Sequence, residues 1–357
     1  MHPSHTTAWR FTALTALTLS LWQLSGNAQA DCRISPSPGV MTFQMALDSY
    51  WVPRDAALGT VIGEKTINVR NDQQLEMICQ NPNGTERIDA RLPATAPIYG
   101  GSLPPVGGKD VNGRVIETNI PGVGAYIDLA QPYTGGRSNY FEPDDGTAIP
   151  YTGVFATKTA FALDASYLRG KVTLIKIGDI APGPQRVDRQ MFEGSIYNLG
   201  KVMEGRLTAT VQPAQCALSA NAVSADPVEL GAHPLADFTG KGSTTLAVPF
   251  HINLTNCVDD ANGSTARAHI RLDGANGSVP LPQKGVFSLT TDSDAKGIGI
   301  RMLHRDGSPV ELNHDEPVTN LSIPETRLDF QAQYYQTEDV VTAGLAKGSL
   351  NFTISYR

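Results

Sequence analysis

The residues best suited to bind a ligand lie in one stretch of the first half of the chain, between Tyr126 and Tyr151. Sugar hydroxyls both donate and accept hydrogen bonds, so sugar-binding sites use planar polar groups such as those of Asp, Asn and Gln. They also use an aromatic ring, which packs against the apolar face of the sugar. The stretch supplies both kinds of group, and loops held by a rigid scaffold commonly carry binding function. We therefore predict a glycan site built from Tyr126, Asp128, Asn139, Tyr140, Asp144 and Asp145.

Other interpretations of these residues stay open at this stage. The stretch is also typical of a solvated loop in which Asp and Gly make turns. Glu142, Asp144 and Asp145 offer the carboxylate oxygens that Ca²⁺ prefers, although their spacing is not that of an EF-hand. Trp51 is a second candidate for ligand binding, but most Trp side chains are wholly or partly buried, which favours a structural role.

Motifs of catalysis are absent from the sequence. It contains no G-x-S-x-G elbow, no H-E-x-x-H and no G-x-x-x-x-G-K-[ST] loop. Beyond the first few residues, histidines occur only in the second half, at His233, His251, His269, His304 and His314. A zinc site built from histidines in the first half is therefore excluded, and we predict no enzyme, no cofactor and no metal. A secreted β-sandwich hydrolase that uses paired carboxylates is the alternative.

The four cysteines fall into two widely spaced pairs, one in each half of the chain: Cys32 with Cys79, and Cys216 with Cys257. No C-x-x-C or C-x-x-H spacing supports zinc binding. Since an exported chain meets the oxidising conditions in which disulfides persist, we predict one disulfide in each half. Each bridge would close a loop of about 40 to 50 residues and stabilise the fold by about 3 to 4 kcal/mol.

The N-terminus, residues 1–30, has the pattern of an export signal. Arg10 is the only charged side chain before Asp31, the residues from Phe11 to Leu24 are largely apolar, and Ala28-Gln29-Ala30 matches a cleavage site. The apolar run is too short to span a bilayer, so we expect cleavage after Ala30 and no membrane span in the product. An uncleaved anchor is the alternative.

Composition favours an all-β protein. The 357 residues include 34 Gly and 24 Pro, and only 18% are charged, which fits short strands joined by tight turns rather than a helical bundle. Turn pairs such as Asn83-Gly84 and Asp145-Gly146 recur at short intervals and indicate antiparallel sandwiches. The net charge of −7, with no Lys/Arg-rich run, argues against a nucleic-acid partner.

The length suggests about two domains, and we place them at residues 31–206 and 207–357. In the first domain, strands are expected at residues 75–80, 87–92, 159–163 and 172–177. In the second domain, three segments alternate between apolar and other residues, and alternate side chains of a strand lie on one face. These segments run from Leu246 to Leu254, from Leu328 to Tyr334, and from Ala346 to Tyr356.

Three segments of the second domain together resemble the pilin domains of bacterial chaperone–usher fimbriae. The first is Val228-Glu229-Leu230-Gly231, the second runs from Val248 to Cys257, and the third runs from Gly344 to Arg357. The last segment has an early Gly, alternating apolar residues and a penultimate aromatic residue, which together form the family's C-terminal signature. The resemblance covers residues 207–357.

The resemblance implies an immunoglobulin-like fold that lacks its last strand and so leaves an apolar groove. A periplasmic chaperone is expected to fill the groove first. At the outer-membrane usher, the N-terminal extension of the adjacent pilin subunit is expected to replace the chaperone by donor-strand complementation. Chaperones of the family usually anchor the terminal carboxylate, here that of Arg357. By position, the groove is expected to be lined by Phe330, Ala332, Leu350, Phe352, Ile354 and Tyr356.

Shaft pilins carry their own donor strand before the first cysteine of the domain, whereas here the product of cleavage would begin at Asp31, with Cys32 next. The resemblance therefore implies a two-domain tip adhesin. Such a protein is exported through the periplasm to the cell surface, where it sits at the tip of the fimbrium. The residues from Tyr50 to Ile62 resemble a segment of the N-terminal domains of these adhesins. The first domain is then expected to bind a surface receptor, a glycan.

Two further points remain open. Leu207, Ala209 and Val211 alternate just before Cys216, and we interpret them as an interdomain linker that merges into the first pilin strand. The alternative to an adhesin is a structural tip or minor fimbrial subunit, which would mediate self-association or biofilm contact without recognising a glycan.

Overall fold

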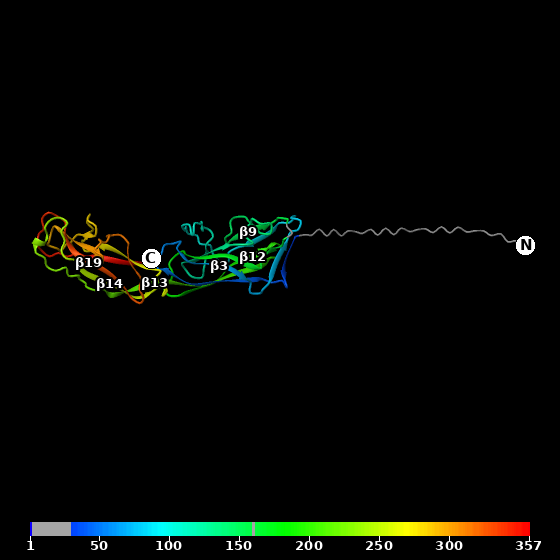
Figure 1. The fold of residues 1–357 in the computed structure, drawn as a ribbon, viewed down its shortest axis with the longest axis horizontal. Coiled ribbons are helices and arrows are strands. Elements are labelled where there is room, and N and C mark those ends of the chain that lie inside the picture. Colours follow the sequence, from blue (N-terminus) through cyan, green and yellow to red (C-terminus); the bar gives the residue numbers. More distant parts are fainter. Residues whose placement is uncertain (2–29, 159–160) are drawn as a thin grey trace.

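The computed structural model describes Met1, residues 30–158 and residues 161–357. Apart from its first and last residues, the predicted signal peptide lies outside the described residues. The described chain forms two β-rich lobes placed end to end, and the C-terminus lies between them (Figure 1). We call these lobes the first module (residues 30–213) and the second module (residues 214–357).

The predicted all-β class is confirmed. In the described residues, the regular structure outside the strands consists of two short 3-10 turns, at Tyr197–Leu199 and Leu235–Asp237. No helix in the described part of the chain has the length and apolar character needed to cross a membrane.

The first module is a sandwich of two sheets with a small third sheet at its side. One large sheet has the order β3-β11-β7-β6, and the facing sheet has the order β13-β12-β5-β9-β8, with β2 parallel to β13. The small sheet has the order β1-β4-β10. Phe43 and Ile88 of one large sheet and Ile127 and Val172 of the other are fully buried in the core between them. The strands are β1 Asp31–Ser35, β2 Met41–Pro53, β3 Val61–Arg70, β4 Glu76–Gln80, β5 Ile88–Leu92, β6 Ile116–Glu117, β7 Val123–Leu129, β8 Glu142–Pro143, β9 Tyr151–Phe155, β10 Leu163–Asp164, β11 Tyr167–Lys176, β12 Gln185–Ile196 and β13 Lys201–Val223.

The second module is a smaller sandwich. The last part of β13 begins one sheet, in the order β13-β14-β19-β17-β16, and the other sheet has the order β18-β15-β20. Leu254 and Leu328 from the first of these sheets and Ala268 and Ile270 from the second are buried between them. The strands are β14 Val248–Val258, β15 Arg267–Gly274, β16 Val286–Phe287, β17 Ile298–His304, β18 Glu316–Asn320, β19 Thr326–Gln336 and β20 Leu350–Tyr356.

One strand, β13, belongs to both modules. It pairs with β12 as far as Val211 and with β14 from Gln215 onward. Leu207 and Val211 are fully buried in the first core, with Ala209 5% exposed, whereas Ala214 is fully buried in the second. The interpretation of residues 207–215 as a linker is therefore wrong in its first half, because these side chains complete the first sandwich. The change of core falls between Val211 and Ala214.

Most of the predicted strands are found, with shifted ends. Residues 75–80, 87–92 and 172–177 overlap β4, β5 and β11, whereas residues 159–160 lie outside the described part and β10 begins only at Leu163. β14 begins after Leu246, whose side chain is 87% exposed. β20 begins at Leu350 rather than Ala346, because the carbonyls of Leu345 and Lys347 accept hydrogen bonds from residues 290–295 instead of from a strand.

Candidate functional site

The six residues predicted to bind a glycan fall into two groups by the contacts they make. In the first group, Tyr126 and Asp128 lie on β7 with their side chains on the same face. The Asp128 carboxylate accepts hydrogen bonds from the Lys109 ammonium at 2.6 Å and from the Thr147 hydroxyl at 2.5 Å. Burial, and then the charge of Asp128, raise the pKa of the Tyr126 phenol, which therefore stays protonated and able to donate.

The charge of Arg114 acts on the Tyr126 phenol and opposes the rise in its pKa, and Arg114 pairs with Asp145, so Asp145 joins the same group. The Arg114 guanidinium pairs with the Asp145 carboxylate and donates to the carbonyls of Ala148 and Pro150. The Arg114 side chain is only 23% exposed, while that of Asp145 is 89% exposed. The mostly buried Arg114 guanidinium thus holds the solvent-exposed Asp145 carboxylate in place. Lys109 and Arg114 were not predicted from the sequence, where the available signal was that each directly follows a Gly.

The other three predicted residues contact different segments. Asn139 donates through its side-chain amide to the carbonyl of Ala162 at 3.3 Å. The Tyr140 ring lies 5.5 Å from the guanidinium of Arg137. Asp144 is exposed and lies 3.9 Å from a nitrogen of Arg87. None of these contacts joins Asn139, Tyr140 or Asp144 to the group around Asp128.

Several aromatic rings of the predicted stretch are core residues. Tyr133 and Phe141 are fully buried and stack at 5.7 Å between ring centres, and Tyr151 packs edge-on against Tyr133 at 5.4 Å. The rings left at the surface of the stretch are Tyr126 and Tyr140, which are half-buried.

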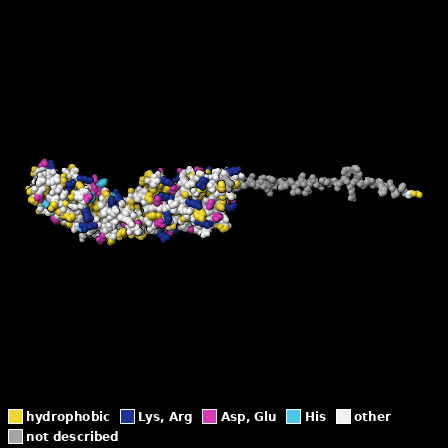
Figure 2. All heavy atoms as spheres, viewed as in Figure 1, with side chains coloured by type: hydrophobic (Ala, Val, Ile, Leu, Met, Phe, Trp, Pro, Cys, Tyr) yellow, Lys and Arg dark blue, Asp and Glu magenta, His cyan; other side chains and the backbone are white. Residues whose placement is uncertain are grey.

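The three carboxylates considered for Ca²⁺ are engaged separately. Asp144 faces Arg87 and Asp145 faces Arg114, while Glu142 accepts a hydrogen bond from the amide of Gly136 at 3.3 Å. In the part of the chain that the structure describes, no group of three or more His, Cys, Asp or Glu side chains is placed to hold a metal ion. Figure 2 shows histidines on the lobe of the second module only.

A long apolar groove runs beside β20 in the second module. β20 pairs with β15 along one edge, and no described strand pairs with its other edge. The groove has a volume of about 980 Å³. Its lining comes from Val223 at the end of β13, from residues 225–235, from residues 341–352, and from side chains of β14, β15, β17 and β19.

Four of the six residues predicted for the groove lie in its lining: Phe330, Ala332, Leu350 and Phe352. The other two, Ile354 and Tyr356, do not line it. Ile354 packs against the second core, and Tyr356 is only 3% exposed and donates from its hydroxyl to the carbonyl of Cys216 at 3.1 Å. The groove thus follows the first half of β20.

Much of the lining was not predicted from the sequence. Ile270 and Leu272 of β15 contribute to it, as do Ile300 and Met302 of β17. Alternation in Ala268, Ile270 and Leu272 was the available signal for β15. The segment Val228-Glu229-Leu230-Gly231 also lines the groove, although the sequence singled it out only for its resemblance to pilins.

The module that carries this groove is similar to known proteins. The family described as "Fimbrial protein" matches residues 205–357. The chain is 31% identical over 165 residues to the S-fimbrial protein subunit SfaG of Escherichia coli O6:K15:H31 (strain 536 / UPEC), and the match covers 46% of this chain and 84% of that subunit. This chain belongs to the fimbrial protein family. The fimbrial subunit type 1 of Salmonella typhimurium is 32% identical to it over 166 residues, which is 46% of this fimbrial protein and 82% of the subunit.

Among solved structures, the CupB6 tip adhesin from Pseudomonas aeruginosa is similar over 91% of this chain and 93% of its own, with 15% identity. The TM-score of 0.34 is low, so no role is transferred from that adhesin. Family membership alone makes this fimbrial protein an exported subunit of a surface fibre and not an enzyme.

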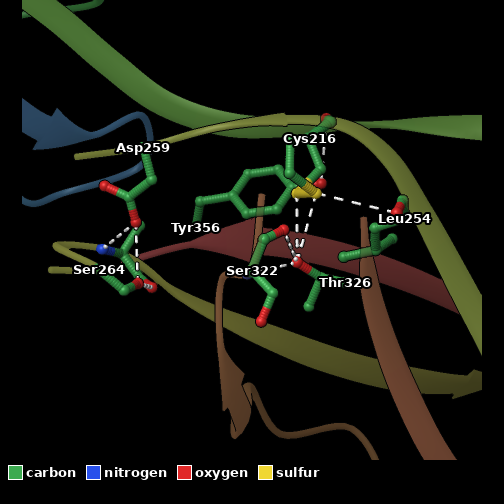
Figure 3. The surroundings of a disulfide bond; sticks show 9 residues. Cys216, Leu254, Asp259, Ser264, Ser322, Thr326 and Tyr356 are labelled. Atoms are coloured by element: carbon green, nitrogen blue, oxygen red, sulfur yellow. Dashed lines mark hydrogen bonds between the residues drawn. A yellow bond between two sulfur atoms is a disulfide. The ribbon is translucent and has the colours of Figure 1, made fainter. Parts of the chain in front are cut away.

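Both predicted disulfides of the fimbrial protein are confirmed. Cys32 pairs with Cys79 and Cys216 with Cys257, 47 and 41 positions apart. The second bridge lies beside the Thr326 hydroxyl, which is 3.3 Å from the Cys257 sulfur (Figure 3). The bridge joins β13 to β14, so it fixes the strand that the two modules share.

The first module of the fimbrial protein binds the C-terminal end of β20. The Tyr356 amide donates to the Asp55 carboxylate at 2.9 Å, and the Asp55 amide donates to the Tyr356 carbonyl at 2.9 Å. The Arg54 guanidinium pairs with Asp55 at 3.0 Å and lies 4.8 Å from the centre of the Tyr356 ring. The turn that follows β2 thus closes on the last residue of β20.

Two further residues of the first module support this junction. Lys176 is only 3% exposed and donates from Nζ to the carbonyl of Arg54 at 2.6 Å. Burial lowers the pKa of the Lys176 ammonium. Trp51 is half-buried and packs against the second core, which confirms its structural interpretation.

Proposed function

We propose that this fimbrial protein is the tip adhesin of a chaperone–usher fimbrium. Its first module binds a surface receptor, a glycan, and its second module joins the fibre by donor-strand complementation. The proposal includes a periplasmic chaperone, an outer-membrane usher and an adjacent pilin subunit as partners, and a location at the fimbrium tip.

One observation carries the tip position. In shaft pilins the segment before the first cysteine of the domain is the donor strand. In this chain the corresponding residues, before Cys216, lie within β13, where they pair with both β12 and β2. Leu207 and Val211 are fully buried in the first core. A segment that is built into a sandwich in this way is not free to enter a neighbouring subunit, so the second module accepts a strand without offering that segment in return.

The groove supports the acceptor role. An unpaired strand edge presents free amide and carbonyl groups, which an added strand satisfies. Leu350, Phe352 and Phe250 pack against the second core but are only partly buried. Alternate apolar side chains of a donor strand would cover them. The contacts with β20 would supply affinity, and the pockets of the lining would supply specificity.

The receptor site is proposed for the first module. Tyr126, Asp128 and Asp145 form the better supported part, because Lys109 and Arg114 hold the two carboxylates in place. Fixed polar groups beside a half-buried ring suit a sugar. Asn139, Tyr140 and Asp144 stay predictions, and their separate contacts make them candidates for a second contact area.

The test uses residues 31–357 with a synthetic peptide. The peptide copies the segment that precedes the first cysteine of the Salmonella typhimurium type 1 fimbrial subunit. Because the unpaired edge favours aggregation, we expect the chain alone to aggregate and the peptide to convert it to a stable monomer on size-exclusion chromatography. A peptide of the same composition in which apolar residues no longer alternate is the control. A chain that is monomeric alone and binds neither peptide would contradict the acceptor role.

The peptide-filled chain is then applied to a glycan array. Saturable binding to one class of sugar is the expected result. No binding to any glycan, combined with clumping of cells that display the fimbrium, would instead favour the structural subunit that mediates self-association.

A further inference from the structure

We propose that Asp55, a residue of the first module, positions β20 and thereby one wall of the groove in the second module. The receptor-binding module would then take part in accepting the donor strand. This inference rests on the proposed function in one respect only, namely that a donor strand fills the groove. The positioning of β20 by Asp55 is inferred from the contacts between Asp55 and Tyr356 alone.

β20 has weak lateral support. The strand has seven residues, and β15 is the one described strand that pairs with it. Leu350 and Phe352, at its start, line the groove. A short edge strand held on one side frays easily at its ends, so whatever holds its last residue limits the movement of the groove wall.

Asp55 makes a pair of hydrogen bonds to the last residue of β20. Its amide and its carboxylate engage the carbonyl and the amide of Tyr356, both at 2.9 Å. Asp55 therefore pairs with Tyr356 at the edge of β20 that β15 does not cover. Hydrogen bonds to a charged group are stronger than those between neutral groups, and the carboxylate is the charged member.

The charge of Asp55 is stabilised by its surroundings. Burial opposes ionisation, but the hydrogen bonds from Arg54 and from the Tyr356 amide outweigh it, so the pKa of the Asp55 carboxyl lies below its usual value. The carboxylate stays ionised at neutral pH. Lys176, nearly buried and bonded to the Arg54 carbonyl, fixes the turn that presents it.

The test uses the full chain, residues 31–357, in the forms Asp55→Ala, Asp55→Asn and Asp48→Ala. Asp48 is the matched control, because it is an acid on β2, the strand that precedes Asp55. Its side chain is 70% exposed and pairs only with Lys65 among the ion pairs of the described residues. Asp55→Asn keeps an oxygen that accepts from the Tyr356 amide. Amide hydrogen exchange is measured over residues 350–357, and the affinity for the fluorescein-labelled donor peptide is measured by anisotropy.

We expect Asp55→Ala to speed exchange at residues 354–356 by about tenfold and to raise the Kd for the peptide by about fivefold, a typical size for coupling between two sites. Asp55→Asn should restore most of the protection from exchange and most of the affinity for the peptide. Asp48→Ala should match the unmodified chain in both measurements. A general loss of folding would not be rescued by Asp55→Asn.

Three outcomes decide against parts of the proposal. Unchanged exchange in Asp55→Ala overturns the positioning of β20. Faster exchange with unchanged affinity overturns the link from Asp55 to the groove. If even the unmodified chain fails to bind the peptide, donor-strand acceptance is wrong, while the exchange data still decide whether Asp55 positions β20.

Discussion

Leu207 and Ala214 lie on one unbroken strand, β13, and yet each is buried in a different hydrophobic core. The backbone therefore passes from one sandwich to the other without an intervening loop. A fragment that ends before Leu207 therefore loses part of the first sandwich rather than a tether.

A fragment of residues 31–206 should fail to fold, whereas one of residues 31–213 should be soluble. The shorter fragment lacks Leu207 and Val211, which are fully buried, and loss of a buried aliphatic side chain costs about 2 to 5 kcal/mol. Together with the lost pairing to β12 and β2, this loss approaches the whole free energy of unfolding of a domain, which is about 5 to 15 kcal/mol. Circular dichroism and thermal unfolding of the two fragments check the prediction, and equal melting temperatures would contradict it.

Phe352→Ala should weaken binding of the donor peptide. Phe352 lines the groove and is only partly buried, so a donor strand would bury more of its ring. Truncation of an anchor in a binding groove typically raises the Kd by about tenfold or more. Asn351→Ala is the matched control, because the neighbouring side chain on β20 is exposed and does not line the groove. Anisotropy titrations compare the two, and equal affinities would argue against a donor strand in this groove.

Asp128→Asn should reduce glycan binding by about tenfold, since it replaces a charged acceptor held by Lys109 and Thr147. Asp188→Asn is the control, because Asp188 also pairs with a cation, Arg206, on β13. Isothermal titration with a glycan identified on the array provides the measurement. If Asn139→Ala abolishes binding and Asp128→Asn does not, the site belongs to the other group of predicted residues.

Asp259→Asn should destabilise the second module by about 2 kcal/mol at pH 7 and by less below pH 4. Burial favours the neutral acid, but hydrogen bonds from Thr265, Ala266 and Ser264 outweigh it and lower the pKa of Asp259. Because the pKa of Asp259 is lower in the folded state than in the unfolded state, its ionisation stabilises the fold at pH values above the pKa of the unfolded state. This stabilisation is lost as the pH falls through the pKa of the folded state.

Urea unfolding of the peptide-filled chain at pH 7 and pH 3.5 measures this effect. Asp273→Asn, which changes an exposed acid paired with Arg271, is the control. A destabilisation by Asp259→Asn that is the same at both pH values would contradict the role of the Asp259 charge.

The sequence predicted the parts of the fold that local pattern determines. Alternation located β14, β19 and β20, and the two cysteine pairs matched the disulfides. Alternation in Leu207, Ala209 and Val211 indicated a strand, but the pattern does not say which sheet a strand joins. For that reason residues that complete the first sandwich were interpreted as a linker.

The candidate sites depend on contacts that leave no local pattern. Asp55 and Tyr356 are 301 positions apart, and neither residue is unusual where it stands. Arg114 and Lys109 are single cations in Gly-containing turns. Four groove residues followed from alternation near the C-terminus, whereas the part of the lining at residues 225–233 is irregular and carries no period that predicts it.

The shared strand β13 also determines how tension would cross the molecule. A pull between a bound receptor and the fibre would travel along the covalent backbone of β13, at right angles to its hydrogen bonds with β12 and β14. Those bonds would then be loaded in shear and share the force, instead of being peeled apart one at a time. An adhesin built in this way would resist detachment under flow without a stiff connector between its lobes.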